Sequence, residues 1–260
     1  MTAVLVDLPV HLRSRLVSAL ESGLLTNPYS VASLQAALGL QDGAEGIALA
    51  LNELARTGIT GRVAAGWLRT IDLAISRVPV PDLVWSGPEV PGLHSRDTRR
   101  VYEELLSSAS HSVWVCTYAY FDGPRAFEVL ARRMSEIPNL RVILLLNIQR
   151  RRGDTTKRED LVRRFTDRYW TEDWPGSRRP AVYYDPRSLE PEGPAGVLHA
   201  KAVVVDDEVV FITSANLTEA ALDRNIEIGL VVRDRPLAAS VSHHFQRLID
   251  LGLLLPLPMA

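Results

Sequence analysis

The sequence predicts an α/β domain preceded by a small helical domain. The chain has 260 residues, of which 47% are hydrophobic, and this suffices for one large or two small packed domains. Residues 1–78 carry apolar positions at helical spacing, whereas residues 96–260 alternate between helical and strand patterns. Residues 79–95 are rich in proline and glycine, as in a linker or an extended crossing segment.

The N-terminal part is expected to form a small helical bundle. Its apolar residues recur three and four positions apart in four segments: Val10–Leu20, Ser30–Leu38, Gly46–Arg56 and Ala64–Ile75. Ser30, shortly after Pro28, is a predicted N-cap. Few basic residues lie in this part, so an interaction or docking role is favoured over a DNA-binding helix-turn-helix.

From Asp97 onward, helices and strands alternate. The expected helices are Asp97–Ser110, Pro124–Ser135 and Pro236–Leu251. The expected strands are Val113–Tyr118, Leu140–Asn147, Ala181–Tyr184, Val197–Val205, Val209–Thr213 and Ile226–Val232. This order is typical of an α/β sheet covered by helices.

Composition excludes several classes of protein. No apolar run approaches the roughly 20 residues of a membrane-spanning helix, and the N-terminus lacks the pattern of a secretory signal. Cys116 is the single cysteine and cannot form an internal disulfide, so we expect a cytoplasmic protein without membrane contact. The net charge of -2 gives no overall attraction to nucleic acid, so whether the protein binds nucleic acid depends on how its charges are distributed locally.

The segment before Asp206 carries the predicted chemistry. Side chains two residues apart in a strand share a face, so His199 and Lys201 point the same way, about 6.6 Å apart, and can hold one phosphate. Only two of the 29 basic residues are lysines, and a lysine in an apolar strand needs an anion. A hairpin centred near Asp207 would bring Ser214 and Asn216 beside the imidazole.

Glu227 is the expected partner of this histidine. It lies in an apolar strand, where a carboxylate without a partner is costly. A carboxylate that accepts one imidazole proton leaves the other ring nitrogen free to attack. Two alternatives stay open: Asp206 is either a turn residue or a site residue, and Asn216 also fits an N-cap with Glu219 as its capping-box partner.

These residues resemble the signature of the phospholipase D superfamily, His-x-Lys-x4-Asp followed by a small-residue segment and Asn. The matching residues are His199, Lys201, Asp206, Ser214, Asn216 and Glu227. Thr213 departs from the glycine that is frequent in the family, which bears on substrate size. The resemblance covers residues 86–260 and implies an α-β-α sandwich with a mixed sheet, preceded here by the helical domain.

The resemblance also implies a mechanism. One histidine attacks phosphorus to give a phosphohistidine, a second histidine protonates the leaving oxygen, and Lys201 and Asn216 hold the non-bridging oxygens. The chain has one such motif, so a two-fold homodimer that brings two copies of His199 together is expected. No cofactor is implied, and no histidines or cysteines have the spacing of a metal site.

The wider arrangement resembles the phospholipase-D-like component of DISARM-type anti-phage systems. The resemblance rests on a helical N-terminal part, one motif, and the runs Phe211–Ala221 and Arg224–Glu227. It implies defence against foreign DNA, with other subunits of a defence system as further partners.

Nucleic acid, and DNA in particular, is the favoured substrate. Residues 150–179 hold ten basic and six acidic residues, and the residues expected to bind substrate are Ser214, Arg150, Arg151, Arg152 and Lys157. The interleaved aromatics Phe165, Tyr169, Trp170 and Trp174 favour a nucleic-acid groove, with a solvated helix as the alternative. Two other functions remain open: a phospholipid phosphodiesterase and a non-catalytic nucleic-acid-binding subunit.

Overall fold

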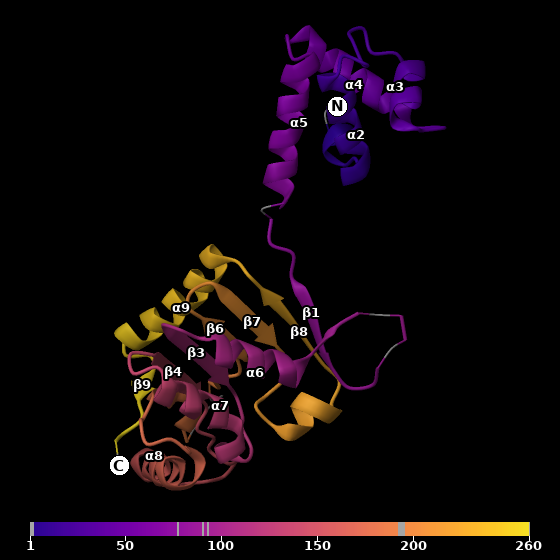
Figure 1. The fold of residues 1–260 in the computed structure, drawn as a ribbon. Helices are drawn as coiled ribbons and strands as arrows, with labels where there is room; N and C mark the ends of the chain where they lie inside the picture. The colour runs from indigo at the N-terminus through magenta and orange to yellow at the C-terminus, as the bar shows by residue number, and fades with distance from the viewer. Residues whose placement is uncertain (1–2, 77, 90, 93, 192–195, 260) are drawn as a thin grey trace. The chain divides into compact units, whose positions relative to one another are not determined.

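The chain folds into two compact units in the computed structural model, Met1–Pro79 and Val80–Ala260 (Figure 1). The structure describes residues 3–76, 78–89, 91–92, 94–191 and 196–259. Each unit has its own hydrophobic core. No helix in these ranges is long and apolar enough to cross a membrane.

The N-terminal unit is helical. Its helices are α1 (Ala3–Val6), α2 (Val10–Glu21), α3 (Val31–Leu38), α4 (Ala44–Arg56) and α5 (Gly61–Ser76). Ser30 caps α3, because its hydroxyl oxygen accepts the Ser33 N–H at 3.1 Å. Arg13 is buried and forms an ion pair with Asp72, so this cation connects α2 to α5 and is not available to a polyanion.

The second unit is built on a mixed sheet. Its described strands are β1 (Asp82–Ser86), β2 (Arg96–Asp97), β3 (Ser112–Thr117), β4 (Arg141–Leu146), β5 (Ala181–Tyr184), β6 (Ala202–Val205), β7 (Val209–Thr213), β8 (Glu227–Val232) and β9 (Leu255–Pro256). The strand order is β2-β1-β8-β7-β6-β3-β4-β5-β9. Strands β3, β4 and β5 are parallel, whereas β6, β7 and β8 pair antiparallel. The predicted α/β class with a mixed sheet is therefore confirmed.

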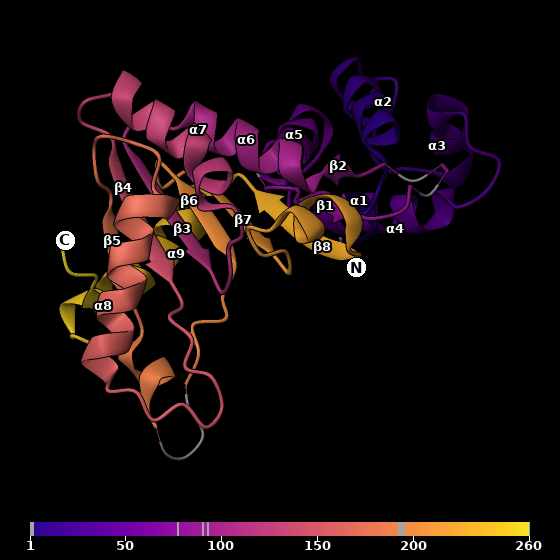
Figure 2. The ribbon, with the colours of Figure 1, turned by 90° about the horizontal axis from the view of Figure 1, so that it is seen from below.

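Helices cover both faces of this sheet. The helices are α6 (Thr98–Ser108), α7 (Gly123–Glu136), α8 (Arg158–Arg168) and α9 (Arg235–Asp250), with short turns η1 (Tyr169–Asp173), η2 (Pro186–Leu189) and η3 (Ala220–Arg224). Val203 and Val205 pack into the core shared with α6 and α7, whereas Val204 packs against Ala238 of α9. Figure 2 shows α6 and α7 along one side of the sheet. Side chains along β6 thus alternate between the helices on one face of the sheet and α9 on the other.

The β6–β7 hairpin sets the register of the site. Ala202 pairs with Ile212 and Val205 with Val209, so the turn is centred at Asp207 as predicted. Asp206 and Asp207 have φ of 54° and 51°. Aspartate tolerates this left-handed conformation better than most residues, and it lets a short loop of three residues, Asp206–Glu208, join Val205 to its partner Val209.

Three short strands were not predicted, and one strand boundary differs from the sequence prediction by more than one residue. β1 lies inside the proline- and glycine-rich residues 79–95, where it pairs with β8, and β2 and β9 have two residues each. β6 begins at Ala202 and not at Val197. The ladders of β6 with β3 and with β7 both end at Ala202, paired with Cys116 and Ile212, so the residues before Ala202 lie outside both ladders.

Candidate active site

The polar residues gather where several strands end at one edge of the sheet. Asn147 follows β4, and its side-chain oxygen accepts the Leu198 N–H at 3.2 Å. The Thr213 N–H at the end of β7 donates to the Lys201 carbonyl oxygen at 3.1 Å. The segment that carries His199 is thus held between the ends of β4 and β7 although it is not itself a strand.

His199 and Lys201 converge as predicted. The Lys201 ammonium lies 3.2 Å from Nε2 of His199 and donates to the His199 carbonyl oxygen at 2.8 Å. Lys201 is only 8% exposed, and this burial lowers its pKa, against the opposing effects of Cys116 and Glu227. Within the described ranges no carboxylate forms an ion pair with this lysine. A buried ammonium without a counter-ion is a site for an anion.

The same contact defines the resting state of the imidazole. If the ammonium donates to Nε2, the single proton of the neutral ring is on Nδ1. An oxygen of a bound phosphate can replace Nε2 as the acceptor of the lysine proton. That exchange would free the Nε2 lone pair for attack on phosphorus.

Tyr118 is a site residue that the sequence analysis missed. It directly follows β3, and its ring centroid lies 4.9 Å from that of His199. The Lys201 ammonium lies 5.5 Å from the same ring centroid. An aromatic residue at the end of a buried strand that pairs with β6 was the available signal, as was the polar Asn147 at the end of β4.

Glu227 has a different partner from the predicted one. Its carboxylate accepts a hydrogen bond from the Ser214 hydroxyl and a long one, 3.5 Å, from the Asn225 side chain. Ser214 in turn accepts the Ile228 N–H at 3.1 Å. Because β7 and β8 pair antiparallel, Ser214, which directly follows β7, lies beside Glu227, the first residue of β8. No hydrogen bond joins Glu227 to His199 among the residues described.

Asn216 faces the loop after β3. Its side-chain oxygen accepts the Ala119 N–H at 3.3 Å, and Ala119 is the residue next to Tyr118. Thr218 accepts the Ala221 N–H, so Thr218 and not Asn216 holds the start of η3. The amide nitrogen of Asn216 forms no hydrogen bond to another described residue and can donate to a bound anion.

Asp206 lies away from this group of residues. It is separated from His199 by roughly 23 Å of extended chain, and its carboxylate accepts the N–H groups of Ser110, His111 and Ser112 at 2.9, 2.7 and 2.8 Å. The turn interpretation therefore applies. Asp206 fixes the start of β3 at the opposite edge of the sheet.

Arg150 is a second correction, because its charge is used within the fold. Its guanidinium donates to the carbonyl oxygens of Leu189, Asp154 and Thr156 at 2.8, 2.7 and 2.6 Å. It fastens the loop after β4 and is not free to bind substrate. The other predicted basic residues, Arg151, Arg152 and Lys157, are exposed on this loop.

The aromatic residues of the basic segment belong to the core. Tyr169, Trp170 and Trp174 are 0%, 8% and 6% exposed, and Tyr169 packs against Phe127 with ring centroids 5.8 Å apart. Phe165 stacks on Tyr169. Their spacing reflects the inner face of α8 and η1, so the expected stacking groove for nucleic acid does not exist here.

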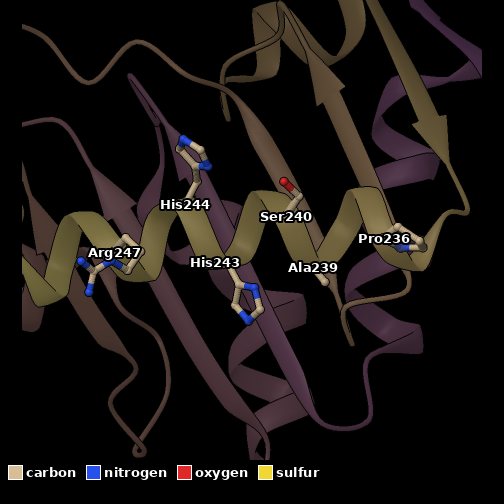
Figure 3. A pocket seen from close by; sticks show the side chains of 6 residues that line it. All are labelled: Pro236, Ala239, Ser240, His243, His244 and Arg247. Carbon is tan, nitrogen blue, oxygen red and sulfur yellow. The ribbon is translucent and has the colours of Figure 1, made fainter.

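No other described histidine contacts His199 or Lys201. His111 is at the opposite edge, beside Asp206, and its side chain is 86% exposed. Figure 3 shows His243 and His244 projecting to different sides of α9, together with Arg247. His94 is exposed in the loop before β2. Among the described residues no group of three or more His, Cys, Asp or Glu side chains could hold a metal ion.

Cys116 is a core residue, as the sequence indicated. It is 1% exposed, and burial raises the pKa of its thiol to about 12. The thiol is therefore protonated at neutral pH and is no nucleophile.

This mixed sheet, with a histidine and a buried lysine at one edge, defines a phospholipase-D-like enzyme. The family model described as "Cardiolipin synthase, PLD-like domain" matches residues 102–249, which is more than half of the chain. The chain belongs to this family and is an enzyme of phosphodiester chemistry. The matched range includes His199, Lys201, Asn216 and Glu227.

Solved structures with a similar fold include three at low sequence identity. The phospholipase D family member Nuc from Salmonella typhimurium is 19% identical (TM-score 0.44) over 68% of this chain and 97% of that chain. NucT from Helicobacter pylori is 17% identical (TM-score 0.45) over 66% and 96%. Phosphatidylserine synthase from Haemophilus influenzae Rd KW20 is 16% identical (TM-score 0.46) over 76% and 47%. The search of curated proteins found no match.

Proposed function

We propose that this protein is a metal-independent nuclease that cleaves DNA through a phosphohistidine intermediate. The observation that carries the proposal is the His199–Lys201 pair, a buried ammonium 3.2 Å from an imidazole and without a carboxylate partner among the described residues. A phosphate group supplies the missing negative charge. The lysine and the Asn216 amide would stabilise the charge that develops on its non-bridging oxygens.

The proposed reaction has two steps. The Nε2 lone pair of His199 forms a bond to phosphorus while the bond to the leaving oxygen breaks, and that oxygen takes a proton from a second histidine. Water then attacks phosphorus and gives a proton to the second histidine, the N–P bond breaks, and both histidines return to their starting states. Glu227 at the start of β8 and Ser214 directly after β7 would support the site through their mutual hydrogen bond, and Ser214 is proposed as a further substrate-binding group.

A polyanionic substrate is favoured by the loop after β4. Arg151, Arg152 and Lys157 are exposed there, and Asn147, at the start of the same loop, bonds to the backbone beside His199. The exposed cations thus lie on a loop that begins at the candidate site. Cations that follow a phosphate backbone give affinity without sequence preference.

The second histidine is proposed to come from a second copy of the chain. Leu83, Leu230 and Ile212 lie opposite one another on β1, β8 and β7, and their exposed fractions are 42%, 45% and 49%. Ile228, 54% exposed, extends this row to the residue after Glu227. A contiguous exposed apolar face marks an interaction surface, and this one extends to the end of β8 that carries Glu227. A two-fold dimer through it would bring two sites together.

The biological setting rests on the sequence resemblance alone. We propose a role in anti-phage defence in the cytoplasm, with other subunits of a DISARM-type system as partners. Residues 1–78 would serve as a helical docking domain and residues 96–260 as the catalytic domain, with residues 79–95 connecting them and adding β1 to the catalytic sheet.

A cleavage assay in EDTA tests the activity. Single-stranded and double-stranded DNA are incubated beside phosphatidylcholine vesicles with the wild type and His199→Ala. His244→Ala, which alters an exposed histidine on α9, is the matched control. DNA cleavage that is lost only in His199→Ala supports the proposal. Cleavage of phosphatidylcholine alone would identify a lipid phosphodiesterase, and DNA binding without cleavage would identify a non-catalytic subunit.

A further inference from the structure

Tyr118 is the only described aromatic residue that contacts both members of the His199–Lys201 pair. Its ring is tilted by 56° to the imidazole, with centroids 4.9 Å apart. The Lys201 ammonium lies 5.5 Å from the centroid of the same ring. One side chain from the end of β3 therefore touches both reactive groups, which come from the segment before β6.

The imidazole needs such a contact because little else holds it. His199 is exposed and precedes the first residue of β6, so no strand ladder fixes its backbone. Glu227, the carboxylate expected to orient the ring, is bonded to Ser214 instead. The tilted contact with Tyr118 limits the rotation of the ring about its side-chain bonds and leaves Nε2 directed at Lys201.

The ammonium needs the ring for a different reason. Burial opposes the charged form of Lys201, and the groups that face it are Cys116 on β3, Glu227 on β8 and the imidazole of His199. The Cys116 thiol is protonated at neutral pH, and Glu227 forms no ion pair with the ammonium in the described structure. The negative face of an aromatic ring favours a nearby cation most where water is excluded.

We propose that Tyr118 is a positioning residue, whose ring orients His199 and keeps Lys201 charged. The ring performs both roles, since the hydroxyl forms no hydrogen bond to a described residue. Tyr118→Phe therefore preserves the function, whereas Tyr118→Leu, similar in hydrophobicity but without a π face, removes it. The kinetic consequence rests on the proposed phosphodiesterase function, but the effect on the lysine does not.

The lysine content of the chain permits a direct measurement. The sequence contains only Lys157 and Lys201, so labelling with 13C at the lysine Cε gives two signals, and exposed Lys157 serves as the internal reference. In Tyr118→Leu the Lys201 signal should titrate at lower pH than in the wild type, because the ring no longer favours the ammonium. In Tyr118→Phe it should titrate as in the wild type.

Kinetics on bis(p-nitrophenyl) phosphate complete the test. In Tyr118→Leu we expect kcat to fall roughly tenfold, with the alkaline limb of the pH profile at lower pH and KM changed less. Phe121→Leu is the matched control, since this ring lies in the same loop and is 74% exposed. Thermal unfolding confirms that each variant is folded at the assay temperature.

The outcomes separate the two proposals. An unchanged Lys201 titration in folded Tyr118→Leu refutes the role of Tyr118, whether or not the enzyme is active. Equal losses in the phenylalanine and leucine variants also overturn it, because the hydroxyl would then be the working group. A wild type without phosphodiesterase activity, but with the expected Lys201 shift, leaves Tyr118 as proposed and refutes the nuclease function.

Discussion

Asp206 offers the sharpest test of the structural assignments, because the three hydrogen bonds it accepts predict an order of stability for three variants. Oδ1 accepts the N–H groups of His111 and Ser112, and Oδ2 accepts that of Ser110. The side chain is 15% exposed, and its φ of 54° lies in the left-handed region. Hydrogen bonding and backbone conformation can therefore be varied separately.

Asp206→Gly removes all three bonds but keeps an allowed backbone. Bonds to a charged acceptor are worth about 1.5–3 kcal/mol when buried and less at exposed amides, so we expect a loss of about 2–3 kcal/mol. Asp206→Ala adds about 1 kcal/mol for the left-handed backbone. Asp206→Asn keeps the oxygen that accepts two bonds and tolerates this φ, so its loss is about 1 kcal/mol.

Calorimetric unfolding measures the difference. For a domain of this size about 1 kcal/mol corresponds to roughly 2–4 °C in Tm, so the glycine variant should unfold roughly 5–10 °C lower and the alanine variant lower still. At temperatures where each variant is folded, kcat should be unchanged, because the carboxylate lies at the opposite edge of the sheet. Equal Tm values for asparagine and alanine, or a folded variant without activity, would refute this reasoning.

Three further predictions concern the site and its surroundings. Cleavage should survive excess EDTA, and activity that disappears on chelation and returns with Mg²⁺ would indicate a metal-bound water as the nucleophile. Lys201→Arg should lower kcat by about 100-fold, because the planar guanidinium does not fit beside the imidazole; a rate within a few-fold of wild type would make the lysine a generic cation. Wild type and His199→Ala mixed in equal amounts, with subunit exchange verified by mass-tagged chains, should show about half of the original activity per wild-type chain, because half of these chains then pair with a mutant. A site complete within one chain would keep full activity.

The sequence predicted the long elements and the hairpin well because each rests on local patterns. The register of β6 with β7 follows from alternation and a three-residue turn, and it brought Ser214 and Asn216 to the correct edge. β1 and β9 were missed because both are short and proline-bounded or proline-containing, and only pairing with distant strands makes them part of the sheet. Such strands have no signal of their own.

The candidate site was predicted less completely than the fold. His199 and Lys201 could be found because a lysine in an apolar segment conflicts with its surroundings. A sequence shows a charged residue but not its bonding partner. The guanidinium of Arg150 and the carboxylate of Glu227 were therefore assigned functional roles, although the folded chain pairs them with a backbone carbonyl oxygen and with the Ser214 hydroxyl. Tyr118 had no such conflict, and its one signal, an aromatic residue after a buried strand, is shared by ordinary core residues.

The location of the reactive groups beyond the strand ends has a consequence for how this enzyme would inactivate. His199 and Lys201 precede β6, and Tyr118 and Asn216 follow β3 and β7, so the ladder hydrogen bonds of the sheet do not hold most of their backbone. Segments of this kind open locally at lower free energy than the strands they extend. On heating, the geometry of the site should be lost reversibly while the sheet is intact, so activity and native secondary structure disappear at different temperatures.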